Sequence, residues 1–358
     1  MDRHVPRRSR HRLPSLRLSE FQLIADLHRR FGRTGPSVLR GIGDDAALIR
    51  LPPGRQLLVT TDLLAEGVHF VRSTASMEEI GYKAAIANLS DIAAMGGVPR
   101  YLLVSLAIPP SHRTSEVRAL YSGLMRACRS PRVELVGGDT SESRGGLFIG
   151  VALLGTVRPN HALRRDGARI GDLLYVTGTL GDALAGLELL AARRNRRSRG
   201  LGPARFLIGR HLRPAARIRE GQLLAEHRLA TAAIDLSDGL SGDLAHLCRQ
   251  SGVGAEIEAA ALPLSPQCRA YAKARGRDPV ALALTGGEDY ELLFTVPPRL
   301  RETVERLVRA AGCRCTRIGV IRPKAFGLRV RQPTGSLASL SITSYQHFRP
   351  ARAGRPEP

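Results

Sequence analysis

The sequence predicts an α/β or α+β protein organised in two halves. Segments with strand patterns alternate with segments of helical periodicity along most of the chain. Its 358 residues suffice for two domains with separate cores. No apolar run approaches the roughly 18 residues that span a bilayer, and no short repeat is present. We expect domains over residues 19–157 and 158–348, with tails at 1–18 and 349–358.

In the N-terminal half, Ser19 resembles a helix N-cap, with Glu20 in the first turn and apolar residues at helical spacing as far as Phe31. Gly96-Gly97 and Pro99 end a second, longer helix. The expected helices are 19–31, 77–96 and 114–129, and the expected strands are 47–49, 57–62, 101–108, 133–136 and 147–157. We expect the strand 57–62 to be buried and to end on Thr60, Thr61 and Asp62, where ligand-binding groups commonly lie.

The C-terminal half repeats the alternation. Several of its strands run directly into turns rich in glycine and carboxylates, such as Asp235-Leu236-Ser237-Asp238-Gly239. The expected strands are 172–177, 231–234, 280–284, 292–296, 317–320 and 327–330, and the expected helices are 182–192, 214–227, 240–248 and 299–311.

The net charge of +22 suggests nucleic-acid binding, but three features argue against a sequence-specific interface. The excess is almost all arginine, because the only lysines are Lys83, Lys273 and Lys324. Aromatic residues make up 4%, with no tryptophan, which is poor for stacking on single strands. The densest basic runs, 7–10 and 193–199, fall in an expected tail and loop. We expect non-specific attraction to polyanions and no specific nucleic-acid partner.

The N-terminal segment and the cysteines bear on cellular location. Residues 1–18 are arginine-rich without the apolar stretch of a secretory signal, so we interpret them as a disordered basic tail, with a transit-type peptide as the alternative. The five cysteines form no CxxC pair, which predicts reduced thiols in a cytoplasmic protein. A metal or redox site at Cys313-Arg314-Cys315 is the alternative.

Aspartates recur at unusual positions. Gly41-Ile42-Gly43-Asp44-Asp45-Ala46 places two adjacent carboxylates after two glycines, which permit backbone angles that other residues avoid. Adjacent carboxylates repel and need water or a cation nearby. Five further aspartates follow or interrupt apolar runs near glycine, serine or threonine: Asp62, Asp91, Asp139, Asp235 and Asp238. This pattern favours hard divalent cations.

The sequence lacks the common phosphate-binding loops. No lysine follows a glycine, which excludes a Walker A loop, and no Gly-x-Gly-x-x-Gly lies between a strand and a helix. A bound nucleotide would therefore depend on arginines or on metals held by carboxylates. Several Mg²⁺ ions on scattered aspartates would suit a triphosphate held beside a second phosphate.

Most of these motifs also have a structural interpretation. An unpaired carboxylate inside a small, apolar helix is costly, so Asp91 predicts a partner, preferably a cation. The carboxylates that suit helix caps or ordinary turns equally well are Asp62, Asp139, Asp235, Asp238 and the pair Glu288-Asp289.

Seven segments follow one another in a recognisable order. They are Gly-Ile-Gly-Asp-Asp-Ala-Ala-Leu (41–48), Thr-Thr-Asp-Leu-Leu-Ala-Glu-Gly-Val-His-Phe (60–70), Asn-Leu-Ser-Asp-Ile-Ala-Ala-Met-Gly-Gly (88–97), Val-Gly-Gly-Asp-Thr (136–140), Val-Thr-Gly-Thr-Leu-Gly-Asp (176–182), Asp-Leu-Ser-Asp-Gly-Leu (235–240) and Thr-Gly-Gly-Glu-Asp-Tyr-Glu-Leu (285–292). Each segment alone is weak, but seven in order are highly specific, and together they resemble thiamine-monophosphate kinases. The similarity runs from about Ser19 to Phe348 and leaves only the tails outside.

The resemblance implies an activity and a fold. Members of this family transfer the ATP γ-phosphoryl group to thiamine monophosphate, giving thiamine diphosphate and ADP with several Mg²⁺ ions, the last step of thiamine diphosphate biosynthesis. The fold implied is that of the wider aminoimidazole ribonucleotide synthetase superfamily. It has an N-terminal α/β domain that dimerises through its sheet and a C-terminal α/β domain, with the site in the cleft. We accordingly expect a cytoplasmic homodimer with no membrane partner.

The resemblance also assigns residues. The magnesium positions are Asp45, Thr60, Thr61, Asp62, Asp91, Asp139, Asp235 and Asp238. The ATP positions are Gly138, Asp139, Arg165 and Ser237, and the thiamine phosphate positions are His69, Glu288 and Tyr345. Asp62 and Asp91 would act in catalysis through metal. No general base is expected, because the attacking phosphate oxygen is already anionic.

Two alternatives stay open. One is another ATP-using enzyme of the same superfamily. Selenophosphate synthetase would have a reactive cysteine or selenocysteine and a lysine within residues 1–40, and the hydrogenase-maturation relative a C-terminal cysteine; this sequence has neither. The other is a basic nucleic-acid-associated protein without kinase activity, against which the intact aspartates argue.

Overall fold

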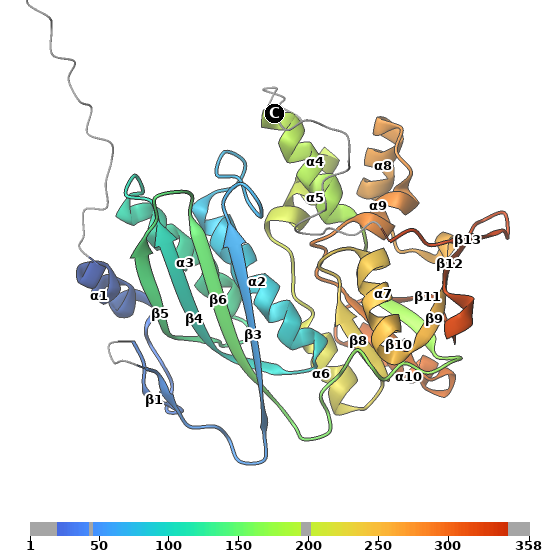
Figure 1. Ribbon diagram of the computed structural model, residues 1–358, viewed down its shortest axis with the longest axis horizontal. Helices are drawn as coiled ribbons and strands as arrows, with labels where there is room; N and C mark the ends of the chain where they lie inside the picture. Colours follow the sequence, from blue (N-terminus) through green and yellow to red (C-terminus); the bar gives the residue numbers. More distant parts are fainter. Residues whose placement is uncertain (1–19, 43–45, 195–201, 343–358) are drawn as a thin grey trace, which may run out of the picture.

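The computed structural model describes residues 20–42, 46–194 and 202–342. Each half is built on its own β-sheet, and helix α2 (Met77–Ala94) lies between the two sheets (Figure 1). A small antiparallel pair, β1 (Val38–Arg40) and β2 (Leu48–Ile49), lies beside the N-terminal sheet.

The N-terminal sheet has four strands in the order β3-β6-β4-β5. Its strands are β3 (Gln56–Ala65), β4 (Val98–Ile108), β5 (Glu134–Glu142) and β6 (Phe148–Val157). Only β4 and β5 are parallel. Helices α2 and α3 (Thr114–Cys128) cover one face, and α1 (Glu20–Phe31) packs on α3 (Figure 1). No helix of the described ranges covers the other face.

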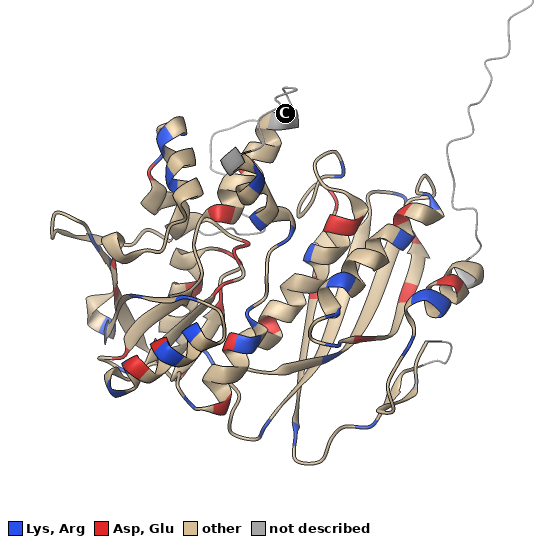
Figure 2. Ribbon diagram, turned by 180° about the vertical axis from the view of Figure 1, so that it is seen from behind, with Lys and Arg blue, Asp and Glu red and all other residues tan. Residues whose placement is uncertain are grey.

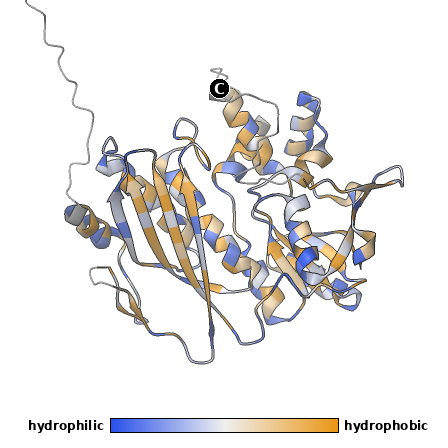
Figure 3. Ribbon diagram, in the orientation of Figure 1, coloured by the Kyte–Doolittle hydropathy of each residue, from blue (hydrophilic) through white to orange (hydrophobic). Residues whose placement is uncertain are grey.

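Strand β3 shows why one face stays open. Its inward residues Leu58 and Leu64 are buried, whereas the alternate residues Leu57, Val59 and Leu63 are 44%, 65% and 60% exposed. Since alternate side chains of a strand point to opposite faces, these residues form an apolar stripe on the uncovered face. Figure 3 shows hydrophobic residues along the strands of this sheet.

Helix α2 begins with a capping box, in which the Ser76 hydroxyl accepts from Glu79 N and the Glu79 carboxylate accepts from Ser76 N. Its crossing with α3 is very close. A Cβ atom on Gly81 would lie 2.0 Å from the Leu120 carbonyl oxygen, and one on Gly123 would lie 1.9 Å from that of Glu78. Glycine at both positions therefore permits the two helices to touch through their backbones.

The C-terminal sheet has seven strands in the order β13-β12-β9-β11-β7-β10-β8, and all neighbours are antiparallel except β12 and β9. The strands are β7 (Leu173–Thr177), β8 (Ala232–Asp235), β9 (Val253–Glu258), β10 (Leu292–Val296), β11 (Cys315–Pro323), β12 (Leu328–Arg331) and β13 (Leu337–Ser339).

Alternate residues of this sheet enter two different cores. Leu174 and Leu293 pack in the core that includes α7 (Leu240–Ser251). Tyr175 and Phe294 stack with ring centroids 5.7 Å apart in the core of α6 (Ile218–Glu226) and α10 (Arg301–Ala310). Helices on both faces explain why the central strands are buried on both sides.

Four further helices form a separate group at one end of this sheet (Figure 1). They share a small apolar core that includes Leu207, Cys268 and Leu282. The helices are α4 (Asp182–Arg194), α5 (Gly202–Leu212), α8 (Pro266–Arg275) and α9 (Pro279–Thr285).

The structure corrects several expected elements. Residues 280–284 form helix α9 instead of a strand, because Asp278 caps it and Pro279 stands in its first turn. Strand β5 continues through Gly138 and Asp139, which were expected in a turn. Strand β3 continues past Asp62 and alternates between buried and exposed residues, so it is not the buried strand expected. Helices α5 and α8 and strand β9 were not expected.

Arginines and lysines are spread over elements of both halves (Figure 2). All five cysteines are free of disulfides. Among the described helices, none combines the length and apolarity that crossing a bilayer requires.

The α2–α3 crossing generates a stability prediction. We expect Gly81→Ala to lower the free energy of unfolding by about 1–3 kcal/mol, because the new methyl group overlaps the Leu120 carbonyl. The matched control is Gly209→Ala in α5, where a Cβ meets nothing within 4 Å. There we expect a gain of up to about 1 kcal/mol from helix propensity. Urea unfolding of both variants measures the difference, and equal effects would refute the close crossing.

Candidate active site

Carboxylates from three elements meet where α2 lies between the sheets. Asp62 lies on the α2-facing side of β3, Asp91 on α2 and Asp235 at the end of β8. The Thr60 hydroxyl, on the same side of β3 as Asp62, donates to Asp91. The Ser90 hydroxyl donates to Asp235 Oδ2 at 2.8 Å, which joins α2 to the C-terminal sheet.

Burial makes these carboxylates hard to ionise. Burial, and then the charge of Asp91, raise the pKa of Asp62 to about 6 and that of Asp235 to about 7. Burial also raises the pKa of Asp91, against the Thr60 hydrogen bond and the charge of Arg165. None of the three has an ion pair with a described residue. Their oxygens are the ligands that hard divalent cations prefer, and a bound cation would relieve the repulsion.

A pocket of about 460 Å³ opens beside Asp91. Its walls combine apolar side chains with charged ones, so it suits a ligand that has both apolar and anionic parts. The residues that line it are Leu58, Val59, Thr60, Asp91, Ile92, Ala94, Met95, Leu163, Arg164, Arg165, Asp166, Ala233 and Gln250.

Two motifs of the C-terminal half run side by side as a continuation of the β8–β10 ladder. Glu288 N donates to Ser237 O at 2.8 Å, and Tyr290 N donates to Leu236 O at 2.9 Å. A Cβ atom on Gly287 would lie 2.6 Å from the Ser237 oxygen, so this approach needs glycine. The ladder places Ser237 next to Glu288, although 51 residues of sequence separate them.

Asp243, on α7, supports the turn at Asp238-Gly239 that follows this ladder. Its Oδ2 accepts from Asp238 N at 3.2 Å and from Gly239 N at 3.1 Å. Burial, and then the charges of Asp235 and Asp238, raise the pKa of Asp243 to about 8. This side chain therefore adds a further hard-to-ionise carboxyl group to the region.

Glu288 has left-handed backbone geometry, with φ 64°, and its side chain faces α2 and α5. Its Oε2 lies 2.5 Å from Lys83 Nζ and 3.3 Å from His211 Nδ1. Burial, and then the charge of Lys83, lower the pKa of His211 to about 4, so this imidazole is neutral at physiological pH. The side chain of Tyr290 packs in the N-terminal core, which anchors the motif across the interface between the halves.

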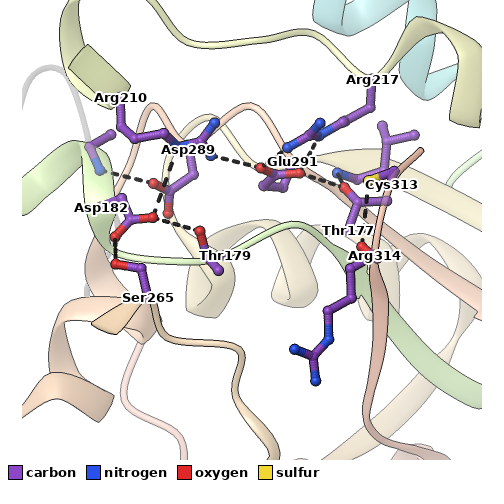
Figure 4. Close-up of polar contacts among 12 residues, drawn as sticks. Thr177, Thr179, Asp182, Arg210, Arg217, Ser265, Asp289, Glu291, Cys313 and Arg314 are labelled. Atoms are coloured by element: carbon purple, nitrogen blue, oxygen red, sulfur yellow. Dashed lines mark hydrogen bonds and ion pairs between the residues drawn. The ribbon is translucent and has the colours of Figure 1, made fainter. Parts of the chain in front are cut away.

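Asp289 and Glu291, the alternate residues of the motif 288–291, belong to a buried network of hydrogen bonds and ion pairs (Figure 4). Asp289 accepts from Gly181 N at 2.6 Å and from Ala183 N at 3.1 Å, at the start of α4. Glu291 is fully buried between Arg210 and Arg217. Although burial opposes its ionisation, these two guanidinium groups hold its pKa below the ordinary value. The network fixes the backbone of residues 288–291.

Comparison with known proteins gives the family. Residues 43–157 match the AIR synthase related protein, N-terminal domain, and residues 169–330 match its C-terminal domain. The thiamine-monophosphate kinase of Haemophilus influenzae is 38% identical over 339 residues, which cover 94% of this chain and 99% of that relative. This chain belongs to the thiamine-monophosphate kinase family.

Solved structures of the family agree with the fold. A thiamine-monophosphate kinase from Stenotrophomonas maltophilia superimposes with a TM-score of 0.78 at 37% identity, covering 90% of this chain and 98% of that one. A structure described as AaThiL complexed with AMPPCP and TMP gives 0.73 at 38% identity, covering 92% and 97%. The resemblance noted from the seven motifs and the two-domain fold that it implies are therefore confirmed, whereas dimerisation stays a prediction.

The structure brings together part of the residue set expected from the family. Thr60, Asp62, Asp91, Asp235 and Arg165 gather around α2, and Ser237, Asp238 and Glu288 form the adjacent ladder. Among the described residues, no group of three or more histidines, cysteines, aspartates and glutamates is arranged to hold a metal ion. The metal positions therefore stay predictions.

Other expected residues lie elsewhere. Gly138 and Asp139 are on β5, at the opposite sheet edge from β3, which two intervening strands place about 14 Å away. The Thr61 hydroxyl lies on the uncovered face and donates to Val151 O at 3.0 Å. His69 follows β3, and its Nδ1 accepts from Ala65 N at 3.0 Å. Asp45 and Tyr345 lie outside the described residues.

Sequence reasoning assigned no role to Lys83, His211 or Tyr290. Lys83 carried a signal, because the chain has only three lysines. Tyr290 lies inside one of the seven motifs. His211 lies in a helix that was not expected, so no local pattern pointed to it.

The buried carboxylates predict an inverted pH dependence of stability in metal-free protein. The folded-state pKa of Asp235 exceeds the ordinary value, so its stabilising contribution is complete below about pH 4 and is lost as pH rises through about 7. We expect Asp235→Asn to be more stable than wild type at about pH 8 by on the order of 1–3 kcal/mol. This advantage should shrink at about pH 5.

Urea unfolding in the presence of a chelator, at both pH values, tests this expectation. Ser90→Ala provides a control, since it removes the hydrogen bond to Asp235 Oδ2 without removing the charge. A difference between Asp235→Asn and wild type that does not change with pH would contradict it.

Proposed function

We propose that this chain phosphorylates thiamine monophosphate with ATP, producing thiamine diphosphate and ADP. The observation that carries the proposal is the convergence of Asp62, Asp91 and Asp235, none of which has an ion pair with a described residue, beside a pocket that contains Arg165. This arrangement suits a cation-dependent reaction between two phosphates, and the chain's family membership agrees with it.

The chemistry of the donors suits Mg²⁺, although the described carboxylates are not arranged around a single ion. Asp62, Asp91 and Asp235, with Thr60 beside them, supply hard oxygen ligands at a place where their mutual repulsion needs a counter-charge. Bound Mg²⁺ would neutralise phosphate charge and help to align the reacting groups. Of the further ligands implied by the family, we expect Asp45 and Asp238 to complete these sites. Thr61, on the uncovered face, and Asp139, at the opposite sheet edge, do not reach them within one chain.

The side chains of the pocket and the ladder would then bind the two substrates. Arg165 offers a cation for ATP phosphates at the pocket, and Ser237 offers a hydroxyl on the adjacent turn. Glu288 would bind thiamine monophosphate, whose thiazolium ring is cationic. An oxygen of the acceptor phosphate forms the new bond to the γ-phosphorus as the bond to the β-phosphate oxygen breaks, so ADP leaves without a general base.

We also propose a homodimer formed through the uncovered face of the N-terminal sheet. Leu57, Val59 and Leu63 of β3 and Phe148 of β6 expose apolar surface there. A contiguous exposed apolar patch is typical of a protein interface. Asp139 on β5 lies opposite Ser105 on β4 in the same sheet, and both of these polar residues are exposed. We expect the dimer to act in the cytoplasm.

A coupled ADP-release assay with thiamine monophosphate tests the proposed activity. We expect turnover that requires ATP, Mg²⁺ and thiamine monophosphate together, with thiamine diphosphate as the product identified by chromatography. ADP release that does not depend on thiamine monophosphate would favour another ATP-using enzyme. A salt-dependent gel shift with short DNA and no turnover would favour the nucleic-acid alternative.

Asp91→Asn provides the decisive variant, because asparagine keeps the size of the side chain and its ability to accept from Thr60 but removes the charge. We expect kcat to fall on the order of 100-fold or more with the fold intact by circular dichroism. Mg²⁺ should also raise the unfolding temperature of wild type more than that of the variant. Activity near wild type at saturating Mg²⁺ would disprove the role of Asp91.

The dimer has its own test. We expect Val59→Arg and Leu63→Arg to yield monomers, because each places a charge in the middle of the apolar stripe. Light scattering coupled to size-exclusion chromatography measures the mass. Leu187→Arg on α4, where leucine is also exposed, should leave the dimer intact. A monomeric wild type, or dimeric β3 variants, would exclude this interface.

A further inference from the structure

Lys83 is an unusual residue in this chain. It is one of three lysines among 54 basic residues, and its side chain is only 7% exposed, whereas Lys273 and Lys324 lie on the surface. It lies on α2, about two turns before Asp91, and reaches from the N-terminal half toward the C-terminal half. Burying an ammonium group without a partner is costly in free energy. The residues that Lys83 contacts therefore indicate its role.

Those contacts converge on one carboxylate. Lys83 Nζ lies 2.5 Å from Glu288 Oε2 and 3.5 Å from His211 Nε2. His211 Nδ1 lies 3.3 Å from the same Glu288 oxygen, in a contact that is not a hydrogen bond. Three segments that are far apart in the sequence therefore meet at Glu288 Oε2. The other oxygen, Oε1, has no hydrogen bond to a described residue, and the Glu288 side chain is 30% exposed.

Contacts of the neighbouring residues fix the position of Glu288. The Glu288 backbone is bound to Ser237, and the next residues, Asp289 and Glu291, are fixed in the buried network. Arg210, the neighbour of His211, binds Glu291 at 2.7 Å, so α5 is attached to the motif through two consecutive residues. The imidazole of His211 is neutral, so Lys83 is the cation that pairs with Glu288 among the residues that the structure describes.

We propose that Lys83 and His211 are positioning residues for substrate binding: Lys83 by its ion pair and His211 by packing hold Glu288 Oε2, so that Oε1 faces the cationic thiazolium ring of thiamine monophosphate. This inference rests on the proposed function, and in particular on Glu288 as a substrate-binding group. Because Lys83 belongs to one half and Glu288 to the other, the carboxylate is oriented only when the two halves are docked. Substrate affinity thus depends on a contact between the halves.

Steady-state kinetics of Lys83→Met in the full chain test the proposal. We expect the KM for thiamine monophosphate to rise about 10- to 100-fold, the range typical of residues that orient a ligand-binding group, while the KM for ATP stays unchanged. Lys83→Arg keeps the charge on a different geometry and should recover part of the loss. The matched control is Lys273→Met on α8, which should behave as wild type.

A double-mutant cycle separates positioning from a merely structural ion pair. If Lys83 acts through Glu288, the variant carrying both Lys83→Met and Glu288→Gln should have the same KM for thiamine monophosphate as Glu288→Gln alone. Independent effects that multiply, or equal rises in both KM values, would overturn the proposal. Thermal unfolding verifies that each variant is folded, and Lys83→Arg and His211→Gln supply the comparison if Lys83→Met is not.

The possible failures can be told apart. No turnover of thiamine monophosphate by wild type would refute the proposed function itself. Turnover with an unchanged KM in Glu288→Gln would refute the substrate role of Glu288. A raised KM in Glu288→Gln together with a normal KM in Lys83→Met and in His211→Gln would refute only the positioning roles.

Discussion

Helix α2 has to be buried on nearly every side, and this constraint organises both halves of the protein. One side packs on the N-terminal sheet, another touches α3 through Gly81, and a third faces the C-terminal half. A helix so enclosed can place polar groups inside the molecule only where partners from both halves meet them. Lys83, Ser90 and Asp91 are such groups, and each binds a different element.

The same burial keeps three carboxylates close together, and their ionisation lowers the stability of the folded protein. Asp62, Asp91 and Asp235 are brought together by packing of the surrounding apolar residues, and the ionised forms of all three are disfavoured there. A protein without a ligand for these oxygens would gain stability by replacing them. Carboxylates kept under repulsion are typical of functional sites, where binding of a cation recovers the free energy.

The C-terminal motif 288–291 shows how one short segment connects several parts of the fold. Its odd and even residues point to different surroundings: Glu288 and Tyr290 face the N-terminal half, while Asp289 and Glu291 face the buried network of α4, α5 and α6. Since Glu291 is held by Arg210 and Arg217, movement of the motif would break a fully desolvated ion cluster. The side of the motif that carries Glu288 is therefore rigid.

The sequence by itself determined the family, the α/β class and the elements with strong local signals. The periodicity and capping residues of α2 and α3 are local properties, and the aspartate motifs are recognisable one by one. Residues 280–284 were expected as a strand because a short apolar run fits either element, although Asp278 and Pro279 are a local helix signal. Only the tertiary structure decided that Thr60 and Asp62 are on the side of β3 that faces α2, and that Lys83 meets Glu288. Those outcomes depend on contacts between residues far apart in the chain, which no local pattern encodes.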